Sequence, residues 1–294
     1  MIRVEAPGKL NLALRVGSKR MDGYHPLNIV FQAVSVYDVL EAENAPEGVF
    51  ELSVSGPQAH LVPTDDSNLA IKAARLLAGP GHGVRMRIAK EIPVTGGMAG
   101  GSADAAAALV ACNELWGLGL GHLELLSLGK ELGADVPFVV FGGTALGVDR
   151  GDELTEVPSR GRFHWALAFS DSELSTPAVF SEFDSLCPGS FEPPAVPQAL
   201  LDALAAGDVY ALADALQNDL QESALRLKPN LRSLMESRKL IGALAALVSG
   251  SGPTVAFLMR DEDAAQRAVT GLRALPGVRD AMAVYGPVAG AEIV

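Results

Sequence analysis

The chain has 294 residues, of which 49% are hydrophobic and 5% aromatic, so it is long enough for two domains with cores filled mainly by Ala, Val and Leu. Its 23 Lys and Arg residues are outnumbered by 35 Asp and Glu residues, and the net charge of -12 argues against broad binding to nucleic acid or anionic membranes. Two cysteines and the absence of long apolar runs predict a cytoplasmic protein, not a secreted disulfide framework or a membrane protein.

The first predicted element is a strand over residues 8–14, Gly-Lys-Leu-Asn-Leu-Ala-Leu, in which side chains alternate between two faces. The residues expected on one face are Leu10, Leu12 and Leu14, and those expected on the other are Lys9, Asn11 and Ala13. Taken alone, the pattern favours a half-exposed strand with Lys9 in solvent. A polar, turn-rich segment over residues 20–27 then leads to a second apolar strand over residues 29–36.

The next elements lead to a glycine-rich segment. A strand is predicted over residues 50–54, and helical spacing of apolar residues predicts a helix over residues 66–78 that ends at Gly79-Pro80. Alternation over residues 84–90 predicts a strand that runs directly into the glycine-rich segment.

Residues 93–108 read Pro-Val-Thr-Gly-Gly-Met-Ala-Gly-Gly-Ser-Ala-Asp-Ala-Ala-Ala-Ala, a glycine loop followed by a helix expected to start near Ser102. Glycine accepts positive φ and lacks a Cβ, so the loop can turn its N–H groups toward an anion. The helix adds unpaired N–H donors and the positive end of its dipole. The segment therefore predicts a phosphate site, with a flexible surface loop as the alternative. It matches neither a Walker loop nor a dinucleotide or protein-kinase motif.

Two helices are expected after the loop, the first ending at Gly117 and the second spanning residues 122–132. A tight connection over residues 133–138 contains Asp135, which by itself would be interpreted as a turn aspartate. It leads into an apolar run over residues 139–141. The pattern changes near residues 151–153, and we expect a domain boundary close to residue 155.

The second half of the chain is predicted to form a further α/β unit. Its expected elements are a strand over 165–169, helices from 197 to 247 broken at Gly207 and Pro229, a strand over 255–259, a helix over 261–275 and a last strand over 282–285. An irregular connector covers residues 192–197. Residues 249–254, Ser-Gly-Ser-Gly-Pro-Thr, form a second glycine loop, and Asp261 is suited to cap the helix that it precedes.

The first glycine loop resembles the second motif of the GHMP small-molecule kinases, P-x-G-x-G-L-G-G-G-S-S-D/N-A-A. Thr95 and Ala99 stand where this motif has glycines, and Ala103 stands where it has its second serine. The loss of that serine would remove one hydroxyl that could contact phosphate or metal, while Ser102 keeps the other.

Other segments resemble the same family in the same order along the chain. Residues 7–11, Pro-Gly-Lys-Leu-Asn, are similar to its first motif, and residues 249–254 are similar to its third. Shorter matches occur at residues 22–25, 133–137 and 218–220. The resemblance covers essentially the whole chain.

The resemblance implies an α/β (α+β) fold of two domains with the active site between them. A ribosomal-S5-domain-2-like domain over residues 1–155 would bind ATP and contain a left-handed βαβ crossover, an exception to the usual handedness. A ferredoxin-like α/β domain over residues 156–294 would bind the second substrate.

The resemblance also implies that ATP is the phosphoryl donor and that Mg²⁺ accompanies it. The residues implied around the nucleotide are Asn68, Lys90, Pro93, Val94, Thr95, Gly96, Gly97, Met98, Ala99, Gly100, Gly101, Ser102 and Ala103. Ser102 is also the implied side-chain contact for Mg²⁺. For Asn68, a role at the start of the helix near residue 66 is an equally good interpretation.

Two implied residues carry the chemistry. Asp135 would take the proton of the acceptor hydroxyl or orient that hydroxyl, and Lys9 would lie opposite it. An ammonium close to a carboxylate favours the ionised form of the carboxylate. The same charge could stabilise the acceptor oxygen as its proton leaves.

The implied acceptor carries a cytidine diphosphate. Tyr24 and Phe180 would stack on the cytosine, a contact worth about 1–3 kcal/mol per base, and His25 would hydrogen-bond the edge of the base. Asn11 would bind the methylerythritol end, and Thr176-Pro177 would shape the pocket. Without the resemblance, a Tyr-His pair is more simply interpreted as loop packing.

Together these assignments predict an ATP-dependent kinase that phosphorylates the 2-hydroxyl of a diphosphocytidyl-linked methylerythritol for isoprenoid synthesis. A mevalonate-type or homoserine-type kinase is the runner-up, but it has no obvious use for residues 22–25. A catalytically silent nucleotide-binding protein is a third possibility, and it would not need the pair of Lys9 and Asp135. The expected partners are the two small-molecule substrates, with neither nucleic acid nor membrane, and the expected state is a monomer or weak homodimer.

Overall fold

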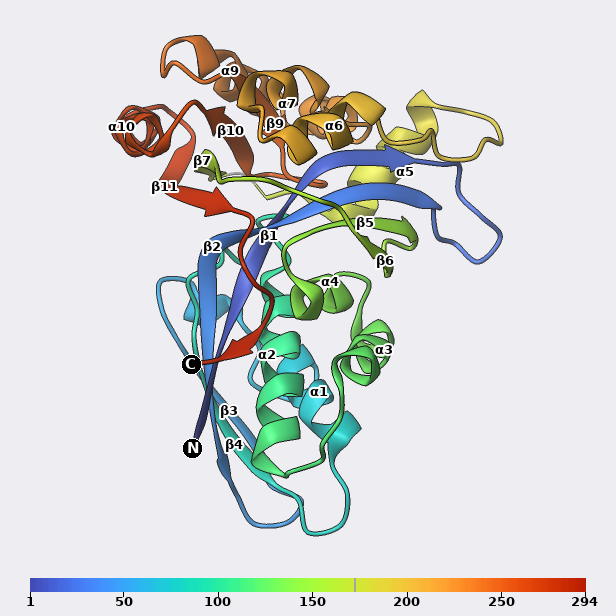
Figure 1. Ribbon diagram of the computed structural model, residues 1–294, viewed down its shortest axis with the longest axis vertical. Helices are drawn as coiled ribbons and strands as arrows, with labels where there is room; N and C mark the ends of the chain where they lie inside the picture. Colours follow the sequence, from blue (N-terminus) through green and yellow to red (C-terminus); the bar gives the residue numbers. More distant parts are fainter. Residues whose placement is uncertain (172) are drawn as a thin grey trace.

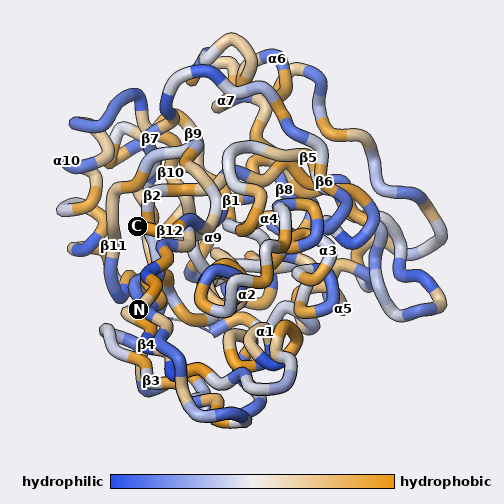
Figure 2. Tube along the Cα trace, turned by 60° about the horizontal axis from the view of Figure 1, so that its bottom comes forward, coloured by the Kyte–Doolittle hydropathy of each residue, from blue (hydrophilic) through white to orange (hydrophobic). Residues whose placement is uncertain are grey.

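The computed structural model describes residues 1–171 and 173–294. The molecule is elongated, and its two parts each contain one sheet and a set of helices (Figure 1). The long strands β1 (Ile2–Val16) and β2 (Leu27–Asn44) pair antiparallel and run from one part into the other. Hydrophilic stretches lie mainly in the loops at the edge of the molecule (Figure 2).

The larger sheet has eight strands with the main order β12-β1-β2-β4-β3. Its other members are β3 (Phe50–Ser55), β4 (Val84–Ala89), β5 (Thr144–Asp149), β6 (Glu153–Glu156), β8 (Gln217–Asn218) and β12 (Glu292–Ile293). β5 pairs with β2 and β6, and β8 pairs with β1. Two short strands from the second half of the chain therefore return to the sheet built by the first half.

Four helices accompany the larger sheet: α1 (Leu69–Leu77), α2 (Gly100–Leu115), α3 (His122–Leu132) and α4 (Val136–Phe141). β3 and β4 are parallel and joined through α1, so this βαβ unit is where the predicted left-handed crossover would lie. The helix α2 packs against β1 and β2 and against the other three helices. Its run of alanines is fully buried because such small side chains let neighbouring elements approach closely.

The smaller sheet has the antiparallel order β11-β7-β10-β9. Its strands are β7 (Phe163–Ser170), β9 (Ala245–Val248), β10 (Val255–Met259) and β11 (Val278–Gly286). With α10 (Glu262–Arg273) between β10 and β11, and helices between β7 and β9, the chain follows the β-α-β-β-α-β sequence of a ferredoxin-like unit.

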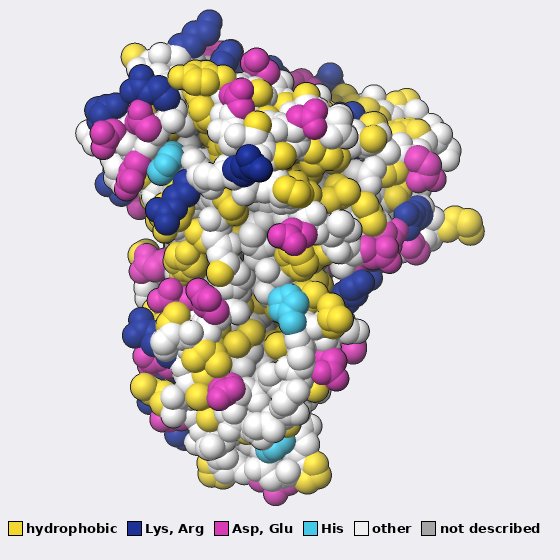
Figure 3. Space-filling view, viewed as in Figure 1, with side chains coloured by type: hydrophobic (Ala, Val, Ile, Leu, Met, Phe, Trp, Pro, Cys, Tyr) yellow, Lys and Arg dark blue, Asp and Glu magenta, His cyan; other side chains and the backbone are white. Residues whose placement is uncertain are grey.

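The helices between β7 and β9 are short. They are α5 (Thr176–Leu186), α6 (Gln198–Ala206), α7 (Val209–Ala215), α8 (Gln221–Leu227) and α9 (Asn230–Glu236), followed by a single turn of 3-10 helix, η2 (Ser237–Lys239). Another such turn, η1 (Ala59–Leu61), lies between β3 and α1. Within the described residues, no helix is both long and apolar enough to cross a membrane. On the face shown in Figure 3, Lys and Arg side chains are interspersed with acidic ones.

Four predictions about these elements are wrong. Leu14 does not share a core cluster with Leu10 and Leu12, because a register shift between Asn11 and Ala13 interrupts the alternation of β1. Both faces of β1 are covered here, so Lys9 is buried and not solvated.

The predicted helical region to residue 247 ends too late, since residues 245–248 form β9 on the edge of β10. A short run such as Ala-Ala-Leu-Val fits a buried strand as well as a helix, and pairing with β10 decides between them. The strand over 282–285 is also not the last one, because β12 follows it. By contrast, α3, β10, α10 and the Asp261 cap are confirmed, the cap accepting from the N–H of Ala264.

Candidate active site

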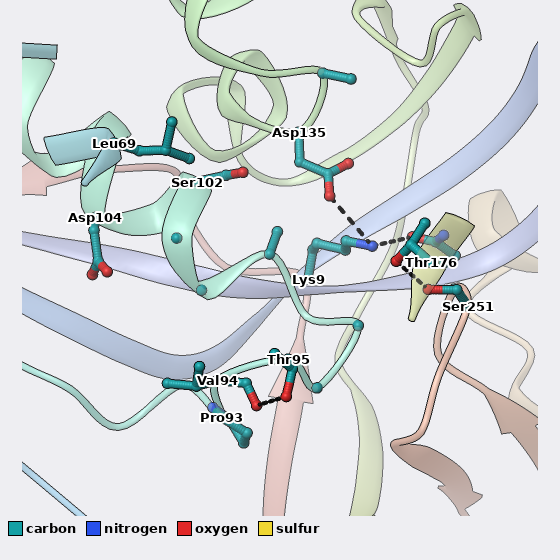
Figure 4. Close-up of a pocket in the computed structure, with 18 of the residues that line it drawn as sticks. Lys9, Leu69, Pro93, Val94, Thr95, Ser102, Asp104, Asp135, Thr176 and Ser251 are labelled. Carbon is teal, nitrogen blue, oxygen red and sulfur yellow. Dashed lines mark hydrogen bonds and ion pairs between the residues drawn. The ribbon is translucent and has the colours of Figure 1, made fainter. Parts of the chain in front are cut away.

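A cavity of about 560 Å³ lies where the first glycine loop, the start of α2 and the loops of the second half of the chain come together (Figure 4). The predicted nucleotide-site residues that line it are Asn68, Lys90, Pro93, Val94, Thr95, Gly96, Gly97, Ala99, Gly100, Gly101 and Ser102. Met98 and Ala103 do not line it, because both side chains are fully buried in the core. Lys9, Asn11, Asp135, Thr176 and Phe180 line the same cavity.

The first glycine loop has three residues in the left-handed region: Thr95 at φ 58°, Gly97 at φ 72° and Ala99 at φ 61°. Thr95 and Ala99 are the residues that replace motif glycines. The backbone therefore keeps a glycine-like conformation at both positions, although a residue with a Cβ pays roughly 1–2 kcal/mol there. The loop therefore has left-handed backbone at two positions that carry a Cβ.

The start of α2 supplies the donors that the sequence predicts. The N–H groups of Gly100, Gly101 and Ser102 occupy the first turn and have no acceptor within the helix. The hydroxyl of Ser102 points toward the side of the cavity where Asp135 lies (Figure 4). An anion placed in the cavity would meet these N–H groups and the positive end of a 16-residue helix.

The buried side chain of Lys90 anchors the start of α2 through hydrogen bonds. Its ammonium donates to a carboxylate oxygen of Asp38, to the carbonyl of Gly100 at 2.8 Å and to Asp104 Oδ2 at 2.9 Å. A Cβ on Gly100 would come within 2.9 Å of Lys90 Nζ, so it would displace an ammonium that three hydrogen bonds hold in place. All three donors of the ammonium are used inside the protein, which leaves none for a nucleotide.

The carboxylate of Asp104 is less well satisfied than that of Asp38. Asp38 Oδ1 accepts from two main-chain N–H groups, those of Glu91 and Ile92, whereas Asp104 Oδ1 is buried with no hydrogen-bond partner. The pKa of Asp104 is raised to about 7, chiefly by burial and also by the nearby charge of Asp38, against the opposing effect of Lys90.

Asn68 acts at the helix start, one of its two predicted roles. Its side chain accepts from the N–H of Ala70 at 2.8 Å and donates to the carbonyl of Pro63 at 2.7 Å. The residue caps α1 and also lines the cavity. A nucleoside contact at this position stays a prediction.

Lys9 and Asp135 form an ion pair in the wall of the cavity. Lys9 Nζ lies 3.7 Å from Asp135 Oδ2, and it also donates to Asn11 Oδ1 at 3.1 Å (Figure 4). Lys9 is 5% exposed, while the Asp135 side chain at the start of α4 is 35% exposed and thus open to a ligand. The main-chain N–H of Lys9 donates to the carbonyl of Met98, which fixes β1 against the glycine loop.

The second glycine loop closes the cavity from the other part of the molecule. Asn218 donates to the carbonyls of Val248 and Gly250, which anchors residues 249–254. The hydroxyls of Ser251 and Thr176 are 2.8 Å apart (Figure 4). Residues 218–220, one of the short segments that resemble the family, thus help to hold the second glycine loop in place.

A second cavity of about 440 Å³ adjoins the first. Tyr24, His25, Pro177 and Phe180 line it, so the predicted base-binding residues are brought together. The rings of His25 and Phe180 have centroids 4.7 Å apart, and His25 Nε2 lies 2.8 Å from Asp184 Oδ1. An aspartate here favours the tautomer with its proton on Nε2, which makes Nδ1 a hydrogen-bond acceptor.

Sequence reasoning missed several residues around these cavities. Asp38 and Asp184 each act through a partner that is distant in the chain, and no local pattern marks them, while Asp104 falls at the D/N position of the glycine-loop motif, which by itself gives it no role. Arg150 lines both cavities, and its only signal in the sequence is its position in the turn-rich stretch near residue 151. Among the described residues, no three His, Cys, Asp or Glu side chains gather as a metal site.

Comparisons with known proteins identify relatives along the whole chain. Residues 68–143 match the family model of the GHMP kinases N terminal domain, and residues 200–276 match that of the GHMP kinases C terminal domain. The 4-diphosphocytidyl-2-C-methyl-D-erythritol kinase of Streptomyces avermitilis is 50% identical over 297 residues, covering 99% of each chain. That of Nocardia farcinica is 51% identical over 298 residues, covering 100% of this chain and 96% of the relative.

Solved structures agree with these relatives. A crystal structure of 4-(cytidine 5'-diphospho)-2C-methyl-D-erythritol kinase superposes with a TM-score of 0.79 at 34% identity, covering 97% of this chain and 99% of the other. A homoserine kinase from Cytophaga hutchinsonii superposes with a TM-score of 0.75 at 18% identity, covering 100% of this chain and 97% of the other. At that identity, the second likeness shows a shared fold alone.

Proposed function

The chain belongs to the GHMP kinase family, and we propose that it transfers the terminal phosphate of ATP to the 2-hydroxyl of 4-diphosphocytidyl-2-C-methyl-D-erythritol. The products would be ADP and the 2-phosphate of the acceptor, an intermediate of the methylerythritol phosphate route to isoprenoids. Relatives about half identical in sequence over the full length are named as kinases of this acceptor.

The observation that carries the proposal is the position of the Lys9–Asp135 pair. The two side chains line the same cavity as the glycine loop, and Ala134, next to Asp135, also lines the second cavity with Tyr24 and His25. A triphosphate at the loop and a cytosine in the second cavity would then present the terminal phosphate and the acceptor hydroxyl to the same pair.

The chemistry follows from this placement. The acceptor oxygen attacks the terminal phosphorus while its proton moves toward the carboxylate of Asp135, and the bond to the bridging oxygen of ADP breaks. The Lys9 ammonium stabilises negative charge on the acceptor oxygen. The N–H groups at the start of α2 hold the phosphates as charge redistributes among their oxygens.

Magnesium fits this site as a companion of ATP. It prefers oxygen ligands and usually takes most of them from substrate phosphates and water, so a preformed cluster of acidic side chains is not required. Ser102 offers an oxygen on the cavity side of α2, and we assign it as the protein contact. When bound, the ion would neutralise charge on the phosphates.

We further propose that residues 1–155 form the ATP-binding domain and that residues 156–294 form the second, acceptor-binding domain, whose site Asn11, Tyr24 and His25 of the first domain complete. Tyr24 and Phe180 would stack on cytosine, His25 would bond its edge, and Asn11 would bind the methylerythritol end. We expect the protein to work in the cytoplasm as a monomer or weak homodimer.

A coupled assay of ADP release tests the proposal with three acceptors: the diphosphocytidyl compound, mevalonate and homoserine. We expect ADP release with the first acceptor only, because mevalonate and homoserine have no nucleobase to occupy the second cavity beside Tyr24 and His25. Comparable release with mevalonate or homoserine would contradict the proposed substrate. ATP binding without ADP release from any acceptor would favour a silent nucleotide-binding protein.

A further inference from the structure

Arg150 is a cation without a charged partner at the junction of the two cavities. Its guanidinium lies over the ring of Tyr24, 4.6 Å from the centroid, and its Nε is buried with no hydrogen-bond partner. Within the described residues, no carboxylate comes within salt-bridge distance of it. The other two cations of the first cavity differ in this respect, since Lys9 pairs with Asp135 and Lys90 pairs with Asp38 and Asp104.

The turn that carries Arg150 is held firmly beside Tyr24. It joins β5 to β6, and the N–H of Gly151 donates to the carbonyl of Val148 at 2.9 Å. Asp149, at φ 60°, pairs with Arg20 of the segment that carries Tyr24. An ion pair and a cation–ring contact therefore connect the two segments, and they fix where the guanidinium lies.

When bound, the acceptor proposed above must span both cavities. Its cytosine would occupy the second cavity and its hydroxyl would reach Asp135 in the first, so the diphosphate that joins them passes the boundary. The residues that line both cavities are Leu27, Ala134, Arg150, Thr176 and Phe180. Arg150 is the only one of these with a charge.

We propose that the guanidinium of Arg150 binds the diphosphate of the cytidine-bearing acceptor where it passes between the two cavities. This assignment rests on the function proposed above. A guanidinium presents several N–H donors in a plane that matches two phosphate oxygens at once, and a partly buried site strengthens such bonds. In a chain of net charge -12, an anionic acceptor needs a local cation of this kind.

The experiment compares the binding of CDP and of cytidine to the full chain by calorimetry. The wild type should bind CDP more tightly than cytidine. Arg150→Gln should weaken CDP binding roughly 10- to 100-fold, the worth of a charge-assisted hydrogen bond, with cytidine and ATP affinities changed by less than about threefold. Arg150→Lys keeps the charge but loses the planar fork, so it should retain part of the preference for CDP, and it decides the question if Arg150→Gln does not fold.

A matched control exists in the same chain. Arg162 lies over the ring of Tyr285 at 4.4 Å and lines neither cavity, so Arg162→Gln removes the same kind of cation–ring contact at a distance from the site. This variant should bind CDP and cytidine as the wild type does. Equal loss of both ligands in Arg150→Gln would show that Arg150 only supports Tyr24, and it would overturn the assignment.

Two other results separate this inference from the proposed function. If the wild type binds CDP and cytidine with equal affinity, the diphosphate contact is wrong while the cytidine acceptor survives. If it binds neither, the cytidine acceptor itself is wrong and the role of Arg150 falls with it. Loss of ATP affinity in place of CDP affinity in Arg150→Gln would also overturn the assignment.

Discussion

Gly101 is a glycine that the protein's own packing does not require. Its φ is not positive, and a Cβ there would meet only Leu69 Cδ1, at an ordinary contact distance of 3.8 Å. Gly97 and Gly100 differ, because a Cβ on either would collide with atoms of the protein. Alanine would suit a helix better at position 101, so the missing Cβ points to a ligand that approaches the main chain closely.

Replacing Gly101 with alanine therefore separates stability from binding. We expect Gly101→Ala to raise the free energy of unfolding by up to about 1 kcal/mol, because glycine costs that much in a helix. We expect the same change to raise KM for ATP roughly tenfold or more, since the methyl group would stand between phosphate and main-chain N–H. Urea unfolding and steady-state kinetics measure the two effects. An unchanged KM would show that no phosphate of ATP contacts the main chain at this position.

Asp104 should make the stability of the protein depend on pH. Its pKa is about 7 in the folded protein because of burial, against an ordinary value of 3.8 in the unfolded chain. Between these values the folded protein holds a proton that the unfolded chain has released. The stability from this proton is fully present below pH 3.8 and is lost as pH rises through about 7.

Asp104→Asn removes this titration, and the family motif accepts either residue at this position. We expect the wild type to lose stability relative to the variant as pH rises from 4 to 7, by roughly 1 kcal/mol or more. Urea unfolding of both proteins across this range measures the difference. A difference in unfolding free energy that is constant with pH would contradict the account.

At the scale of elements, the contact between the two glycine loops brings the two halves of the chain together. A Cβ on Gly97 would lie 2.3 Å from the carbonyl oxygen of Ser249, and the hydroxyl of Ser249 donates to the carbonyl of Gly97 at 3.1 Å. The φ of 72° at Gly97 is also one that side chains disfavour. Both features require glycine at this position.

Gly97→Ala should push the loops apart. We expect KM to rise for both substrates and the free energy of unfolding to fall by more than the roughly 1–2 kcal/mol that left-handed backbone alone costs. Gly48→Ala is the control, because Gly48 has φ 78° and open space around its Cβ position. If both variants lose the same stability and Gly97→Ala keeps normal kinetics, the loop contact does not organise the site.

Elements with a local signal could be predicted from the sequence, and those decided by distant partners could not. The first glycine loop, α3, β10 and the cap at Asp261 follow from glycine content, apolar spacing and capping chemistry. The register shift in β1 depends on its pairing with β2, and β9 depends on the free edge of β10.

The same distinction applies to the site. Lys9, Asp135 and the glycine loop were identified through their motifs, and the structure brings them to one cavity. Asp38 lies 52 residues from Lys90 and Asp184 lies 159 residues from His25, so no periodicity could reveal these two partners. Their catalytic and binding roles stay predictions.

At the scale of the whole molecule, two adjoining cavities allow the two substrates to be perturbed separately. Phe180 packs on His25 and belongs to the wall of the second cavity. We expect Phe180→Ala to raise KM for the cytidine substrate about 5- to 100-fold, the worth of one stacked base, with KM for ATP within a few fold of wild type. Steady-state kinetics with each substrate varied in turn measures both values, and equal effects on the two would contradict base stacking.

In the proposed mechanism, the phosphoryl group is transferred to an acceptor hydroxyl that Lys9 and Asp135 activate. The rate of a single turnover by the Asp135→Asn variant tests this role most directly. We expect the variant to bind ATP and the diphosphocytidyl acceptor nearly as the wild type does, because asparagine keeps the shape of the side chain. Its rate of ADP formation should fall about 10²- to 10⁴-fold, the usual worth of a positioned acid or base. A rate within a few fold of wild type would contradict the claim.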